Sequence, residues 1–125
     1  MPTFTLRTTP LRGKTILIVE DEPLVALYVH SALRAAGAGL IAATNSTEAL
    51  ALIRRNEIAA AIIDVNLGGQ DCLAVCQALF HRLVPFAFYT GHADADLLKA
   101  WPGVRVLRKP ARDSEIIDCI VELTS

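Results

Sequence analysis

Ile16-Leu17-Ile18-Val19-Glu20-Asp21 decides the fold, because an apolar run rich in β-branched residues leads directly into two carboxylates. Such a run favours a buried β-strand. A carboxylate at the end of a buried strand is costly unless a ligand or ion uses it, since an unpaired charge resists leaving water. This stretch therefore predicts a strand whose end contributes to a binding site.

The same arrangement recurs three times further along the chain. Apolar runs lead into Asp64, into Thr90 and into the pair Lys109-Pro110. In open parallel α/β sheets, ligands bind in the crevice beyond the carboxyl ends of the strands. We therefore expect the carboxylates, the hydroxyl and the amine to meet at one edge of a sheet.

Strand-like apolar runs alternate with segments of helical period, which is typical of βαβ units and a parallel sheet. The predicted strands span 15–20, 39–43, 59–64, 85–90 and 104–107, and the predicted helices span 23–36, 46–56, 71–82, 93–100 and 113–123. Asn45 and Glu48 resemble a capping box that opens the second helix. The apolar surroundings of the middle strands predict helices on both faces. We expect an α/β protein, a three-layer α/β/α sandwich around five parallel strands.

The chain has 125 residues, which suits one core better than two domains. We expect an N-terminal tail over 1–13 and one domain over 14–124. The tail lacks the apolar middle region of a secretion signal. The mean hydropathy is +0.42, but the strongest apolar run, Ile58 to Val65, is far shorter than a membrane-spanning helix. We therefore expect a cytoplasmic protein without membrane insertion.

Charge and cysteine content exclude two further classes of function. Twelve basic and thirteen acidic residues give a net charge of -1, which argues against direct binding of nucleic acid. The three cysteines, Cys72, Cys76 and Cys119, are odd in number and have no nearby His pair. Buried structural thiols are therefore favoured over a metal or redox site.

Five features occur in chain order, each at or just after the end of a predicted strand: Glu20-Asp21, Asp64, Asn66, Thr90-Gly91 and Lys109-Pro110. Together they resemble the receiver domain of two-component response regulators, over roughly residues 14 to 124. Because the chain ends at Ser125, it is similar to the stand-alone, single-domain type. The resemblance implies a flavodoxin-like, doubly wound sheet with the strand order 2-1-3-4-5.

The resemblance also implies the roles of individual residues. Asp64 would be the phosphoacceptor that forms an aspartyl phosphate. Lys109 would pair with the phosphoryl oxygens, and Thr90 would donate its hydroxyl to them. Glu20, Asp21, Asp64 and the backbone carbonyl of Asn66 would hold Mg²⁺ or Mn²⁺, because these ions prefer oxygen ligands.

The implied function is to accept a phosphoryl group from a histidine kinase or phosphotransfer protein and to signal through another, unidentified protein. Such a protein catalyses only its own phosphorylation and dephosphorylation, so we expect no enzyme activity on other substrates. One alternative is a small aspartate-nucleophile phosphohydrolase, although Asn66 stands where those enzymes carry a second Asp. Another is a receiver-like interaction module that works without phosphorylation.

The sequence departs from the usual receiver pattern at Val106, where most members carry Tyr or Phe. There is then no large ring on the fifth strand to swing inward when Thr90 moves toward a phosphoryl group. We expect phosphorylation to change the ordering of residues 91–103 instead.

Overall fold

Five parallel strands form the centre of the computed structural model, which describes residues 9–67, 72–91 and 95–125. The strands are β1 (Thr15–Val19), β2 (Gly39–Ala43), β3 (Ala60–Ile63), β4 (Phe86–Thr90) and β5 (Arg105–Arg108). Their order in the sheet is β2-β1-β3-β4-β5, with every neighbouring pair parallel. The fold and the strand order that were expected from the sequence are confirmed.

A helix follows each strand. The helices are α1 (Pro23–Ala35), α2 (Ser46–Arg55), α3 (Leu73–His81), α4 (Ala95–Ala100) and α5 (Asp113–Leu123). All ten predicted elements are present, and the described boundaries differ from the predicted ones by at most two residues. The predicted starts of α3 at 71 and of α4 at 93 lie outside the described residues.

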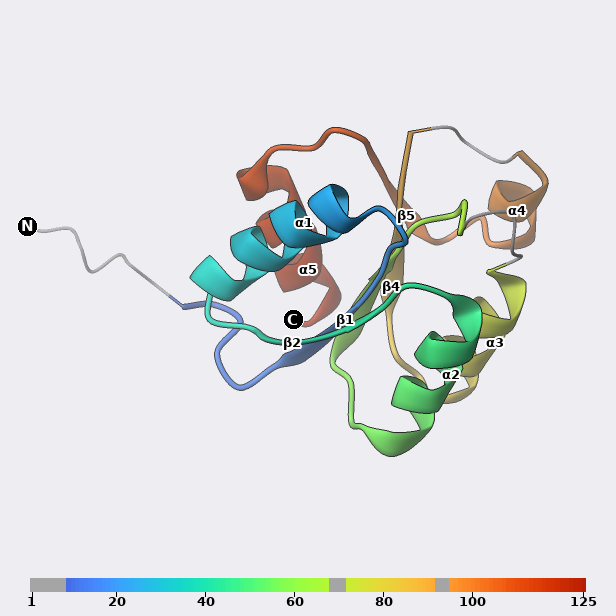
Figure 1. Ribbon diagram of the computed structural model, residues 1–125, viewed down its shortest axis with the longest axis horizontal. Helices are drawn as coiled ribbons and strands as arrows, with labels where there is room; N and C mark the ends of the chain where they lie inside the picture. The colour runs from blue at the N-terminus through green and yellow to red at the C-terminus, as the bar shows by residue number, and fades with distance from the viewer. Residues whose placement is uncertain (1–8, 68–71, 92–94) are drawn as a thin grey trace, which may run out of the picture.

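Helices cover both faces of the sheet, with α1 and α5 on one face and α2, α3 and α4 on the other (Figure 1). An apolar layer lies between the sheet and the helices on each face. Side chains alternate along β1, so that Ile16 and Ile18 pack toward α1 and α5 while Leu17 and Val19 pack toward α2 and α3. This alternation follows from the period of two in a strand. Both faces of β1 are buried, which explains its continuous apolar sequence.

The ends of two helices show why the chain turns where it does. Asn45 caps α2 by accepting the Glu48 backbone N–H at 2.9 Å, as predicted. The Glu48 carboxylate accepts the backbone N–H of Thr44 at 2.8 Å, and this bond lowers the pKa of Glu48. Beyond α1, Gly37 has a φ of +96°, and a Cβ there would lie 2.8 Å from the Thr9 Cβ. Only glycine fits that turn.

The three cysteines are buried, in agreement with the structural role expected for them. Burial raises the pKa of the Cys119 thiol and so keeps it protonated. Across the described ranges, no helix is both long and apolar enough to span a bilayer.

Candidate functional site

The carboxyl edge of the sheet carries a hollow of about 400 Å³ that is rich in charged and polar groups. Its lining residues come from the loops that follow β1, β3, β4 and β5: Asp21, Glu22, Asp64, Asn66, Thr90, Gly91 and Lys109. Parallel strands end at the same edge, so residues more than 80 positions apart in the chain become neighbours. The predicted crevice and its residues are therefore brought together, with Glu20 buried beside them.

The Lys109 ammonium is the centre of the site. Its Nζ lies 2.9 Å from Glu20 Oε1, 3.2 Å from Glu22 Oε1 and 3.3 Å from Asp64 Oδ2. Burial acts to lower the pKa of Lys109, but the hydrogen bond and charge of Glu20 and the charge of Asp64 outweigh burial and raise it. The amine thus stays protonated and offsets part of the negative charge around it.

Glu20 lies beneath the hollow, with only 3% of its side-chain surface exposed. Burial raises the pKa of Glu20 to about 7, with help from the charge of Asp64, while the Lys109 hydrogen bond and the Glu22 backbone N–H oppose the shift. That N–H donates to Glu20 Oε2 at 3.1 Å. Glu20 therefore changes its charge near neutral pH unless a cation stabilises the carboxylate.

Asp64 directly follows β3 and is almost fully buried. Its backbone N–H donates to the Val19 carbonyl at 2.8 Å, which ties the β3 end to β1. Its Oδ1 accepts the backbone N–H of Asn66 at 3.1 Å. These bonds fix the carboxylate at the floor of the hollow, within reach of Lys109.

Thr90 and Gly91 form the β4 side of the site. Thr90 is buried, and its carbonyl accepts the Lys109 backbone N–H at 2.9 Å, which aligns the ends of β4 and β5. A Cβ at Gly91 would meet no atom within 4 Å. The Gly91 backbone therefore borders open space, and it lines the same hollow as Asp64 and Thr90.

The acidic residues form a set suited to a divalent cation. Carboxylate oxygens of Glu20, Asp21, Glu22 and Asp64 all lie within 4.8 Å of one another. Two full charges at that spacing repel by about 3 kcal/mol at an effective dielectric constant of about 20. Oxygen ligands in a partly open hollow suit Mg²⁺, which keeps several waters and takes one or two carboxylates. The donor set therefore fits the ion predicted from the sequence.

Two contacts at the site were not predicted from the sequence. Glu22, with its side chain 63% exposed, joins the ion-pair network of Lys109. Tyr89 is buried in β4, where its hydroxyl accepts the Ala111 backbone N–H at 3.1 Å and its ring centre lies 5.6 Å from Lys109 Nζ. The role of Glu22 could have been predicted from its place in the acidic run 20–22. The sequence does not distinguish Tyr89 from an ordinary core residue of a strand.

Residues 92–94 of the segment 91–103 lie outside the described residues, and the structure does not test the change of ordering expected there. Val106 is half-buried on β5. Trp101 covers the core, with its ring centre 5.6 Å from that of Phe86 and 5.8 Å from that of Phe80. A change of ordering in this segment on phosphorylation stays a prediction.

The strand order and the acidic hollow at the carboxyl edge define a flavodoxin-like α/β protein of the receiver type. The family model for the response regulator receiver domain matches residues 16–121. The chain belongs to that family.

Solved structures agree with this assignment at the level of the fold. A response regulator receiver protein from Sinorhizobium medicae WSM419 is 23% identical, with a TM-score of 0.82 over 91% of this chain and 96% of that one. A response regulator from Thermotoga maritima is 23% identical, with a TM-score of 0.75 over 89% and 97%.

A third similar structure is the receiver domain of a sensor histidine kinase from Pseudomonas aeruginosa PAO1, which has a magnesium ion coordinated in its active-site cleft. It is 22% identical, with a TM-score of 0.79 over 90% of this chain and 98% of that one. Among curated protein sequences, no relative matches this chain.

Proposed function

We propose that this receiver domain accepts a phosphoryl group on Asp64 from a phosphohistidine of a kinase or phosphotransfer protein. One observation carries the proposal: a buried carboxylate lies 3.3 Å from a buried ammonium, inside a hollow lined by further carboxylates. A structural Asp does not need open space beside it, whereas a nucleophile does.

In the proposed reaction, an Asp64 carboxylate oxygen attacks the phosphorus atom of the donor as the bond from phosphorus to the histidine nitrogen breaks. The Lys109 ammonium turns from its carboxylate partners toward the phosphoryl oxygens. Thr90 donates its hydroxyl to one of these oxygens, and the space beside Gly91 accommodates the group.

Glu20, Asp21, Asp64 and the backbone carbonyl of Asn66 would hold Mg²⁺ or Mn²⁺. When bound, the cation offsets the charge between the carboxylates and the incoming phosphoryl oxygens. Glu22 is a further candidate for this set, because its carboxylate belongs to the same 4.8 Å cluster. The protein's own residues then need only to position the nucleophile and the ammonium.

The apolar face of α1 supports a protein donor rather than a small molecule. Leu24, Leu27 and Tyr28 are exposed, and they follow the acidic residues 20–22 in the chain. Exposed apolar side chains beside a reaction site are typical of a protein-binding surface. We propose that the phosphodonor covers this face while its histidine enters the hollow.

Incubation with acetyl phosphate and Mg²⁺, followed by intact mass spectrometry, tests the proposal. We expect a gain of one phosphoryl group in wild type and none in Asp64→Asn. Asp118→Asn, a change at an exposed aspartate on α5, serves as the matched control and is expected to be phosphorylated like wild type. Phosphorylation of Asp64→Asn to the wild-type level would contradict the assignment.

Two outcomes separate the alternatives. A phosphohydrolase would hydrolyse phosphate esters other than the acyl phosphate donor, whereas we propose that the protein phosphorylates and dephosphorylates only itself. A module that works without phosphorylation would gain no mass at all.

A further inference from the structure

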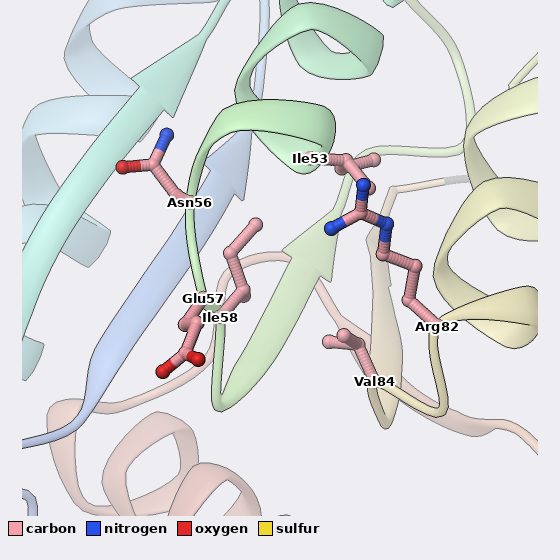
Figure 2. A pocket seen from close by; sticks show the side chains of 6 residues that line it. All are labelled: Ile53, Asn56, Glu57, Ile58, Arg82 and Val84. Atoms are coloured by element: carbon pink, nitrogen blue, oxygen red, sulfur yellow. The ribbon is translucent and has the colours of Figure 1, made fainter.

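A second hollow, of about 320 Å³, lies at the opposite, amino edge of the sheet (Figure 2). It is lined by residues from the end of α2, from the segment before β3 and from the turn after α3: Ile53, Asn56, Glu57, Ile58, Arg82 and Val84. We call these residues, together with Leu83, the α2–α3 corner. The reaction proposed above uses none of them.

The α2–α3 corner has an apolar floor between two opposite charges. Ile53 and Val84 are buried and Ile58 is half-buried, so the floor is built from the core itself. Figure 2 shows the Glu57 carboxylate and the Arg82 guanidinium on opposite sides of Ile58. Both are exposed, and within the described residues no ion pair joins them.

A hydrogen bond fixes the Arg82 guanidinium at the rim of the hollow. Its Nη2 donates to the Arg54 carbonyl at the end of α2, at 3.3 Å. One guanidinium edge thus ties α2 to the turn after α3. The planar group carries five donors, so it keeps donors for a carboxylate from outside.

Leu83 is the least expected member of the corner. It has a φ of 60°, and 88% of its surface is exposed. Its N–H donates to the Phe80 carbonyl and the next N–H, of Val84, donates to the Leu79 carbonyl, a pattern that ends a helix with a left-handed residue, usually Gly. A bulky side chain is strained in that conformation. Neither the end of α3 nor the core accounts for an exposed leucine at this position.

We propose that the α2–α3 corner binds a second copy of this chain across a two-fold axis. In such a contact the same surface meets itself, so it must be complementary to itself. A two-fold axis through the apolar floor brings Glu57 of each copy opposite Arg82 of the other. The half-buried Ile58 and the exposed Leu83 of each copy are then removed from water. The opposite charges on the two sides of one hollow provide the charge complementarity that favours a second copy over an unrelated partner.

The α2–α3 corner offers seven residues, whereas a standard interface uses about 20–30 residues a side, so we expect a weak dimer. Sedimentation velocity of the unphosphorylated protein from about 10 μM to about 1 mM tests for it. We expect wild type to shift from monomer toward dimer over this range. A monomer at every concentration would overturn the proposal and assign the corner to a different protein partner.

Charge exchange tests the geometry. Glu57→Arg and Arg82→Glu should each remain monomeric alone, because each places like charges opposite one another. An equimolar mixture of the two variants should form a heterodimer, since both charge pairs are then restored. A dimer that persists unchanged in each single variant would show that another surface carries it, and would overturn the proposal.

Leu83→Gly tests whether Leu83 contributes to dimerisation rather than to the stability of the fold. Glycine suits the left-handed conformation, so the melting temperature should stay the same or rise while dimerisation weakens by about tenfold or more. Leu24→Ala, a change at an exposed leucine of α1, is the matched control and should leave dimerisation unchanged. Equal dimerisation of wild type and Leu83→Gly would contradict the role of Leu83. Because no phosphoryl donor is present, these results are independent of the function proposed for Asp64.

Discussion

At the scale of single residues, the positive charge of Lys109 offsets the repulsion within a cluster of carboxylates. It approaches Glu20, Glu22 and Asp64 from one side, and only 14% of its own side chain is exposed. A buried ammonium is stable only with such partners. The same ammonium is the group that an incoming phosphoryl oxygen would attract. The bonds that hold the Lys109 ammonium in the resting site are therefore those that the proposed reaction would exchange.

Glu20 provides a prediction about pH. Its pKa is about 7 in the folded protein and near the usual 4.5 in the unfolded chain, so between these values the folded state holds a proton that the unfolded chain has released. The contribution of Glu20 to stability therefore falls as the pH rises from about 4.5 to about 7 and is constant above that.

The measurement is the free energy of unfolding by urea, without divalent cations, at about pH 5 and about pH 7.5. We expect Glu20→Gln to lose less stability than wild type across this interval, and Asp118→Asn to match wild type. Identical pH dependence in wild type and Glu20→Gln would show that Glu20 titrates at its ordinary pKa.

At the scale of secondary structure elements, sequence periodicity was sufficient to predict every strand and helix and the edge at which the polar residues meet. The helices show a period of 3.6, whereas a strand buried on both faces, such as β1, shows a continuous apolar run, and both signals depend on local burial. The contacts of Glu22 and Tyr89 could not be predicted in this way. They join residues 87 and 22 positions apart, and they depend on how far each loop extends beyond its strand.

The left-handed Leu83 illustrates the same limit. The sequence before it, Phe80-His81-Arg82, contains no glycine to mark the end of a helix. The helix ends there because β4 must begin at Phe86 to align with Ala61 of β3. Strand register, which is a tertiary property, thus overrides the local preference for glycine.

Tyr89 connects β4 to the segment that leads into α5, and this link provides a prediction. Tyr89→Phe keeps the ring but leaves the Ala111 N–H without its acceptor in a buried position. We expect a loss of about 1–3 kcal/mol in the free energy of unfolding. We also expect slower phosphorylation by acetyl phosphate, because the loop tethered by this hydrogen bond includes Lys109.

Tyr28→Phe is the control, because the Tyr28 hydroxyl also has a partner but is partly exposed. Its hydrogen bond to Asp113 on α5 raises the pKa of Tyr28. Loss of this exposed bond should change stability far less than loss of the buried Tyr89 bond. If both variants unfold and react like wild type, the Tyr89 bond does not support the site.

At the scale of the whole molecule, the two edges of the sheet have different chemistry. The carboxyl edge gathers the carboxylates, Lys109 and Thr90, whereas the amino edge carries the apolar floor of the α2–α3 corner. The buried core lies between them, so a dimer formed through the corner leaves the reaction hollow open. A phosphodonor could then reach both copies from outside the pair.

The final prediction concerns metal binding and global stability. Mg²⁺ should raise the melting temperature, because the folded protein brings the carboxylates together and the unfolded chain does not. At a concentration 100 times the dissociation constant, such binding adds about 2.7 kcal/mol, or on the order of 10 °C for a chain of this size. Asp21→Ala removes one of the proposed ligands, so most of this gain should vanish, while Asp118→Ala should keep it. Thermal unfolding with Mg²⁺ and with EDTA measures the difference for each protein. An equal gain in wild type and Asp21→Ala would place the metal somewhere other than the acidic hollow.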